Sequence, residues 1–184
     1  MKIMGIVGSP RRDGTTYTIV EKLLNSEEEQ KHEYEIHRLN SLNINPCQAC
    51  YYCKENDGCD LDDDMVNLYK ELYDSDLIVI GSPIYFGEVT SQTKLFIDRL
   101  YGLYNNKKRE FKDKKVLLIY TYANSDENTY NNYIENQKKY LYDFVGFKII
   151  ETIKLHGIAE KKDYLNNKEL IEKLETIKTN LINL

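Results

Sequence analysis

The chain has 184 residues, of which 41% are hydrophobic and 30% charged, and its formal net charge is -5. This length fits one domain, and the mild acidity argues against nucleic acid or an anionic membrane as a partner, because either would require a basic surface. No apolar run is long enough to span a bilayer. Residues 1–7 are apolar but too short for a signal peptide, so we expect a cytoplasmic protein. We also expect one domain over residues 1–184.

Strand-like and helix-like segments alternate along the chain. Apolar runs and alternating patterns predict strands at Lys2–Val7, Tyr34–Leu39, Asp76–Ile80, Val116–Tyr120 and Phe147–Leu155. Apolar residues at helical spacing predict helices at Thr15–Leu24, Asp62–Tyr73, Ser91–Leu103, Thr129–Val145 and Lys168–Leu181. This alternation predicts an α/β fold, a flavodoxin-like doubly wound sheet of five parallel strands in the order 2-1-3-4-5, with helices on both faces.

The segment after the first predicted strand has the composition of a phosphate site. Its glycines let the backbone approach a ligand, its hydroxyls and arginines suit phosphate oxygens, and the next helix adds N–H groups and a positive dipole end. It has neither a Walker Gly-Lys-Ser/Thr nor the three-glycine dinucleotide spacing, which favours a mononucleotide. The candidate residues are Ser9, Arg11, Arg12, Gly14, Thr15 and Thr16. The alternative is an ordinary strand–helix turn with Thr15 as N-cap.

Three motifs occur in order along the chain: Gly8–Thr16, Gly81–Gly87 and Gln92–Arg99. Together they resemble the NADPH-dependent FMN reductase branch of the flavodoxin-like proteins. The first is similar to the FMN phosphate loop of that family, the second to its second flavin loop, and the third to the helix that follows. The resemblance implies an FMN-dependent oxidoreductase that forms a homodimer or homotetramer, with NAD(P)H as a possible substrate.

Two further segments follow the third and fourth predicted strands and meet the same edge of the sheet. The first can offer backbone groups to the pyrimidine edge of a flavin, and its aromatic rings can cover one flavin face, although both rings could instead be core or interface residues. Its candidate residues are Pro83, Ile84, Tyr85, Phe86 and Gly87. The second is selected by position alone and comprises Tyr122, Ala123 and Asn124. Asp98 and Arg99 are expected to form an ion pair or a cap, outside the site.

All four cysteines lie in one loop, residues 45–61, in the pattern C-x2-C-x2-C-x5-C. This grouping indicates a metal or redox site rather than a disulfide framework. Two successive x2 spacings suit a polynuclear iron–sulfur cluster better than zinc. The pattern also resembles that of the iron–sulfur flavoproteins, a subgroup whose cluster passes electrons to FMN near a subunit interface. The resemblance implies a [4Fe–4S] cluster held by Cys47, Cys50, Cys53 and Cys59; zinc and free redox-active thiols are the alternatives.

Three functions are compatible with these features. The first is a redox protein in which a [4Fe–4S] cluster, FMN and a small-molecule or protein partner exchange electrons; it requires no side chain as acid or base, so no catalytic residue is assigned. The second is a cluster-free NAD(P)H-dependent reductase of flavins, quinones or nitro-compounds. The third is a flavin-free module whose cysteines hold zinc, which the intact phosphate loop disfavours.

Overall fold

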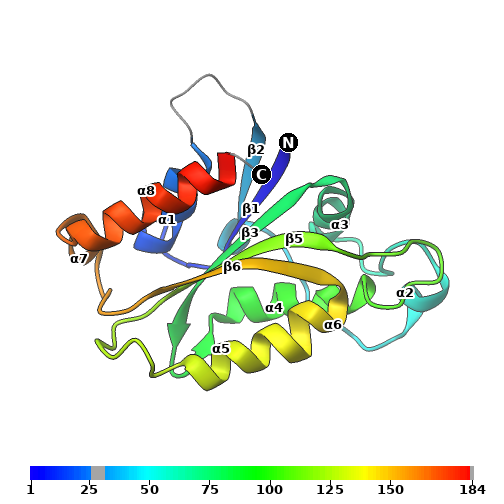
Figure 1. The fold of residues 1–184 in the computed structure, drawn as a ribbon. Helices are drawn as coiled ribbons and strands as arrows, with labels where there is room; N and C mark the ends of the chain where they lie inside the picture. Colours follow the sequence, from blue (N-terminus) through cyan, green and yellow to red (C-terminus); the bar gives the residue numbers. More distant parts are fainter. Residues whose placement is uncertain (26–31, 183–184) are drawn as a thin grey trace.

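The computed structural model describes residues 1–25 and 32–182, and it has a central sheet between two layers of helices (Figure 1). The main strands are β1 (Lys2–Val7), β2 (Glu33–Arg38), β3 (Leu77–Tyr85), β5 (Lys114–Thr121) and β6 (Phe147–Leu155). They are parallel and lie in the order β2-β1-β3-β5-β6, so the predicted fold class and strand order are confirmed. The sequence did not predict the short strand β4 (Glu88–Val89), which pairs antiparallel with the end of β3.

Helices cover both faces of the sheet (Figure 1). One face packs against α1 (Thr15–Leu24) and α8 (Lys168–Ile182), and the other packs against α3 (Met65–Asp74), α4 (Ser91–Arg99) and α5 (Asn131–Gln137). Neighbouring strand residues point to opposite sides, so Val79 packs toward α1 while Ile78 and Ile80 pack toward α3 and α4. This two-sided burial explains why the central strands are continuous apolar runs.

Several segments differ from the elements predicted from sequence. Strand β3 extends to Tyr85 because Ser82 and Pro83 continue the pairing with β5. The helix predicted over 129–145 consists of α5, a π-helical segment over Lys138–Tyr142 and α6 (Asp143–Val145). Short helical elements without a predicted counterpart are α2 (Tyr52–Glu55), α7 (Lys161–Leu165) and the 3-10 turn η1 (Leu39–Ser41). In the ranges that the structure describes, no helix has the length and apolar character needed to cross a membrane.

Helix α4 connects the two regions where the sequence predicts function. Its N-cap, Thr90, donates a hydrogen bond to the carbonyl oxygen of Gly8 at 2.6 Å, beside the phosphate loop. At the other end, Arg99 contacts the chain that leads into the cysteine loop. Nine helical residues span about 13 Å at 1.5 Å per residue. Figure 1 shows α2, within the cysteine loop, at the end of the molecule away from the β3–β4 turn.

Candidate functional site

One pocket of about 220 Å³ collects residues from the loops after β1, β3, β5 and β6. The predicted site residues that line it are Ser9, Arg11, Gly14, Thr15, Thr16, Pro83, Ile84, Tyr85, Tyr122 and Ala123. The predicted site residues Arg12, Phe86, Gly87 and Asn124 are outside the pocket lining, and their part in binding stays a prediction. Thr121, Ile158 and Ala159 also line the pocket but were missed from sequence. The position of 158–159 just after a parallel strand was the available signal, because such loops share one sheet edge.

The phosphate end of the pocket is the N-terminus of α1. Its N-cap is Gly14, so Thr15 is the first helical residue and not the N-cap. Within the described ranges, no side chain caps this end, and the first turn has no acidic residue. The unpaired N–H groups and the positive dipole end are therefore available to an anion. A Cβ on Gly14 would lie 3.2 Å from Ser9 Oγ, so the loop closes tightly at glycine. These features fit a phosphate monoester.

The two arginines of the phosphate loop are in different environments. Arg11 lines the pocket, and its Nη1 donates a hydrogen bond to the carbonyl oxygen of Ala159 at 3.1 Å. This bond joins the loop after β6 to the phosphate loop. Arg12 is exposed like Arg11, but it lies outside the pocket lining. Only Arg11 is therefore placed to neutralise an anion in the pocket.

Buried hydroxyl groups join the phosphate loop to the start of α4. Thr93 Oγ1 lies 2.8 Å from Thr90 Oγ1 and 2.9 Å from Ser82 Oγ. Gly8 donates its N–H to the carbonyl oxygen of Gly81 at 2.8 Å. A Cβ on Gly8 would lie 1.7 Å from Thr93 Oγ1, so glycine is required here by packing. The first two pocket loops are thus held together as one unit.

The third pocket loop is fixed by its neighbours. The N–H of Tyr122 donates to the carbonyl oxygen of Leu155, and the N–H of Ile158 donates to the carbonyl oxygen of Tyr122. The buried Tyr122 hydroxyl donates to the carbonyl oxygen of Glu127 at 2.9 Å, and burial raises the pKa of Tyr122 to about 12. A loop held on both sides gives the pocket a stable wall.

The turn between β3 and β4 presents aromatic side chains beside the pocket. Tyr85 lines the pocket and is 41% exposed, whereas Phe86 is fully exposed. The backbone φ angles of Phe86 and Gly87 are +51° and +86°, the combination that a tight two-residue hairpin turn requires. The alternative of Phe86 as a core residue is therefore wrong. Its side chain projects from the rim of the pocket.

All four cysteines are free and line a second cavity, of about 80 Å³. Each x2 gap contains one residue with left-handed backbone: Ala49 has φ +51° and Tyr51 has φ +60°. Residues with a Cβ seldom adopt this conformation, and such strain concentrates at functional sites. Each left-handed residue reverses the chain locally, so successive cysteines reach the same cavity. Burial raises the pKa of the Cys53 thiol above its ordinary value.

The grouping of metal-ligand atoms in the described residues can be compared with that of a zinc site. Four thiolates around zinc, with Zn–S bonds of about 2.3 Å, lie about 3.8 Å apart. In the part of the chain that the structure describes, the group of ligand atoms within 4.8 Å of one another consists of Glu35, His37 and Glu71, and it includes no cysteine. Among the described residues, the cysteines therefore share a cavity without three of their sulfurs lying within 4.8 Å of one another.

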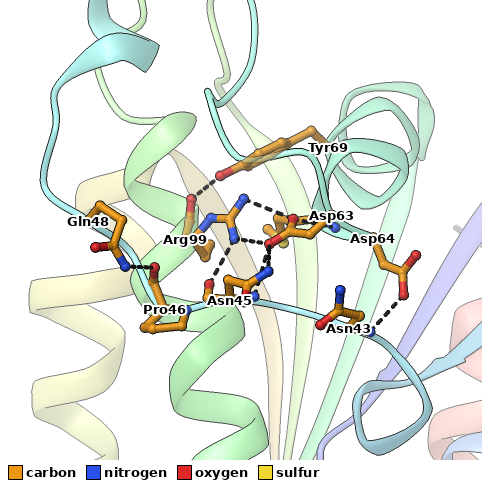
Figure 2. Close-up of polar contacts among 9 residues, drawn as sticks. Asn43, Asn45, Pro46, Gln48, Asp63, Asp64, Tyr69 and Arg99 are labelled. Atoms are coloured by element: carbon orange, nitrogen blue, oxygen red, sulfur yellow. Dashed lines mark hydrogen bonds and ion pairs between the residues drawn. The ribbon is translucent and has the colours of Figure 1, made fainter.

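A buried ion pair closes the neck of the cysteine loop (Figure 2). Arg99 Nη1 donates to Asp63 Oδ2 at 2.6 Å and to the carbonyl oxygen of Asn45 at 2.8 Å, while Nη2 donates to Asp63 Oδ1 at 3.1 Å. Asp63 also accepts from the backbone N–H of Asn45 at 2.9 Å. Asp98 and Arg99 each form an ion pair, as expected, but with different partners. Asp98 pairs with Lys94 on the surface, and Arg99 pairs with Asp63.

Comparison with known proteins extends these observations. The family model for NADPH-dependent FMN reductase matches residues 1–137. Iron–sulfur flavoproteins of Methanocaldococcus jannaschii and Methanosarcina thermophila are 41% and 34% identical, each over 99 residues, which are 54% of this chain and 51% and 52% of those proteins. The chain thus spans about half the length of these curated relatives. An NAD(P)H:quinone oxidoreductase from Methanothermobacter marburgensis shares the fold, with TM-score 0.74, 17% identity and coverage of 98% and 96% of the two chains.

Proposed function

Because the chain belongs to the NADPH-dependent FMN reductase family, we propose that its pocket binds FMN and that it acts as a flavin-dependent oxidoreductase. The observation that carries this proposal is the convergence of four loops on one pocket with the uncapped N-terminus of α1 at its base. When bound, FMN supplies hydride and single-electron chemistry. Ser9, Thr15 and Thr16 provide hydroxyls for the phosphate, and Arg11 provides the opposing charge.

The pocket is smaller than a whole flavin nucleotide would need, which is compatible with an oligomer. Pockets that enclose a whole ligand measure about 300–1,000 Å³, and this one measures about 220 Å³. It is large enough for the phosphate end and the chain attached to it, so the ring system would extend past Tyr85 onto the surface beside Phe86. A second copy of the chain would cover a ring placed there. A homodimer or homotetramer therefore remains our proposal for the assembly.

We further propose that the cysteine cavity holds a [4Fe–4S] cluster. The shared cavity and the left-handed residues between the cysteines support this assignment. The relatives named iron–sulfur flavoproteins support it as well. When bound, the cluster supplies one-electron transfer. The cysteines would hold it, and Tyr101, which also lines the cavity, would limit solvent access. The electron donor and acceptor, small molecule or protein, and the cytoplasmic location stay predictions.

Anaerobic purification followed by FMN, iron and sulfide analysis tests both proposals. We expect yellow-brown protein with FMN and about four iron atoms per chain, and an EPR signal of a [4Fe–4S] cluster after reduction. Cys50→Ala should lose iron but keep FMN. Tyr52→Phe, in the same loop but outside the cavity lining, should keep both.

Each contrary outcome identifies which proposal fails. FMN without iron or sulfide would reject the cluster and leave a cluster-free NAD(P)H-dependent reductase, which rapid bleaching of the flavin by NADPH or NADH would support. A protein that stays colourless after incubation with excess FMN would reject flavin binding. Stoichiometric zinc in that colourless protein would support the zinc-binding module.

A further inference from the structure

Arg99 contacts both ends of the cysteine loop from a helix that lies outside it. Asn45 precedes the first cysteine, and Asp63 follows the last; the guanidinium bonds to both (Figure 2). A second pair of bonds, between Asn43 and Asp64, continues this junction: Asp64 Oδ2 accepts from the N–H of Asn43 at 2.7 Å. One end of α4 thus closes the loop without contributing a ligand.

The burial of this pair is unusual for a contact between a helix and a loop. The Arg99 and Asp63 side chains are 1% and 0% exposed. Removing such charges from water is costly, and only well-placed partners offset that cost. Lys94 and Asp98, on the same helix, form an ordinary exposed pair instead. The two parallel hydrogen bonds of Arg99 therefore restrict the orientation of the loop as well as its distance from α4.

One donor of Arg99 has no assigned role in this network. Its Nε is buried and has no hydrogen-bond partner among the residues that the structure describes. Tyr69 donates its hydroxyl to the carbonyl oxygen of Arg99, and Cys59 and Tyr69 line a common cavity. The last cysteine therefore lies near the Tyr69–Arg99 contact. An unpaired buried donor costs free energy for the fold.

We propose that Arg99 is the positioning residue of the cysteine site: by holding Asn45 against Asp63, it sets the distance between Cys47 and Cys59 before any metal binds. This inference rests on the proposed cluster. A loop closed in advance loses less conformational entropy when its four thiolates are ordered around a cluster. Residues that hold ligands in place contribute about 10- to 100-fold to metal affinity in other sites.

Three variants and a matched control test this role. Arg99→Met removes the clamp, and Arg99→Lys keeps the charge but loses the two-pronged geometry. The double variant Asp63→Asn/Arg99→Met removes both charges and so avoids an unpaired buried carboxylate. Lys94→Met breaks the exposed pair on the same helix and is the control. The readouts are hydrogen exchange of the metal-free protein over residues 46–62, iron uptake with added iron and sulfide, thermal stability, and FMN binding.

We expect Arg99→Met to exchange faster over residues 46–62 and to bind iron about tenfold more weakly or worse, with FMN binding unchanged. Arg99→Lys should be intermediate. The double variant should recover thermal stability but not loop protection or iron uptake, and the control should match the unmodified protein. Unchanged loop exchange and iron uptake in Arg99→Met would overturn the proposal. So would recovery of iron uptake in the double variant, because Arg99 would then only neutralise Asp63.

The failure of this inference is distinguishable from the failure of the proposed cluster. If the unmodified protein takes up no iron, the cluster is rejected, while loop exchange in metal-free Arg99→Met still decides whether Arg99 orders the loop. If Arg99→Met does not fold, it will not bind FMN either. Arg99→Lys and the double variant then decide the outcome by the same measurements.

Discussion

Substitution of Gly8 by alanine tests the junction between the phosphate loop and α4. The added Cβ would lie 1.7 Å from Thr93 Oγ1 and 3.3 Å from Thr90 Oγ1. Thr93 cannot rotate away without losing its bonds to Ser82 and Thr90. Overpacking costs about 1–3 kcal/mol, and each lost buried hydrogen bond adds about 1 kcal/mol. We therefore expect Gly8→Ala to lower the free energy of unfolding by about 3–5 kcal/mol. This is a large part of the roughly 5–15 kcal/mol typical of a domain.

Denaturant unfolding and FMN titration measure the two consequences. The phosphate-binding residues follow Gly8 directly, so FMN affinity should also fall at least about tenfold, or 1.4 kcal/mol. Thr93→Ala removes the clashing oxygen but leaves a Cβ at 3.0 Å. The double variant Gly8→Ala/Thr93→Ala should be more stable than additivity predicts, by about 1–3 kcal/mol. Normal stability in Gly8→Ala, or additive effects in the double variant, would refute this reasoning.

Three further predictions concern charge and ionisation. Arg11→Ala should weaken FMN binding about 10- to 100-fold, the contribution of a charge-assisted hydrogen bond. Arg12→Ala, outside the pocket lining, should change the FMN Kd little, and equal losses in the titrations would contradict the assignment. The raised Tyr122 pKa of about 12 stabilises the fold at pH values below its ordinary 10.0, and this contribution is lost as pH rises toward 12. The free energy of unfolding of Tyr122→Phe should therefore fall less between pH 10 and 12 than that of the unmodified protein. Denaturation experiments that show the same fall in both proteins would refute the burial argument. Burial opposes ionisation of Asp63, but hydrogen bonds from Arg99 and Asn45 hold its pKa below the ordinary value. The difference in free energy of unfolding between Asp63→Asn and the unmodified protein should therefore shrink as pH falls through that depressed pKa. Denaturation experiments in the acid range measure this difference, and a constant difference would contradict the prediction.

The strands and helices most accurately predicted from the sequence have clear local end signals. Lys2–Val7, Thr15–Leu24 and Phe147–Leu155 have the predicted bounds, because a glycine or asparagine lies next to an end of each apolar pattern. Strand β3 was predicted too short, since Ser82 and Pro83 have turn composition and only their pairing with β5 makes them a strand. Pairing between distant segments has no local signal.

The same distinction separates the predicted from the missed site residues. The phosphate loop was predictable because its glycines, hydroxyls and arginines are consecutive in the chain. Ala159 was missed because its contact with Arg11 spans 148 positions. Arg99 was recognised as an ion-pairing residue, but its partner lies 36 positions away and its link to the cysteine loop required the folded chain. Residue composition identifies a site whose residues are consecutive in the chain. The contact of Arg99 with the cysteine loop depends instead on how distant segments fold together.

Helix α4 fixes the rotation of the two sites about a common axis as well as their separation. Thr90 and Thr93 hold the phosphate loop at its start, and Arg99 holds Asp63 at its end. One inserted residue would advance the far end by about 1.5 Å and turn it by about 100°, taking Arg99 away from Asp63 while Thr93 stayed in place. The contacts to the two sites therefore keep a fixed angle to each other around the axis of α4. An insertion or deletion in this helix preserves that angle only when its length is close to a whole number of helical turns.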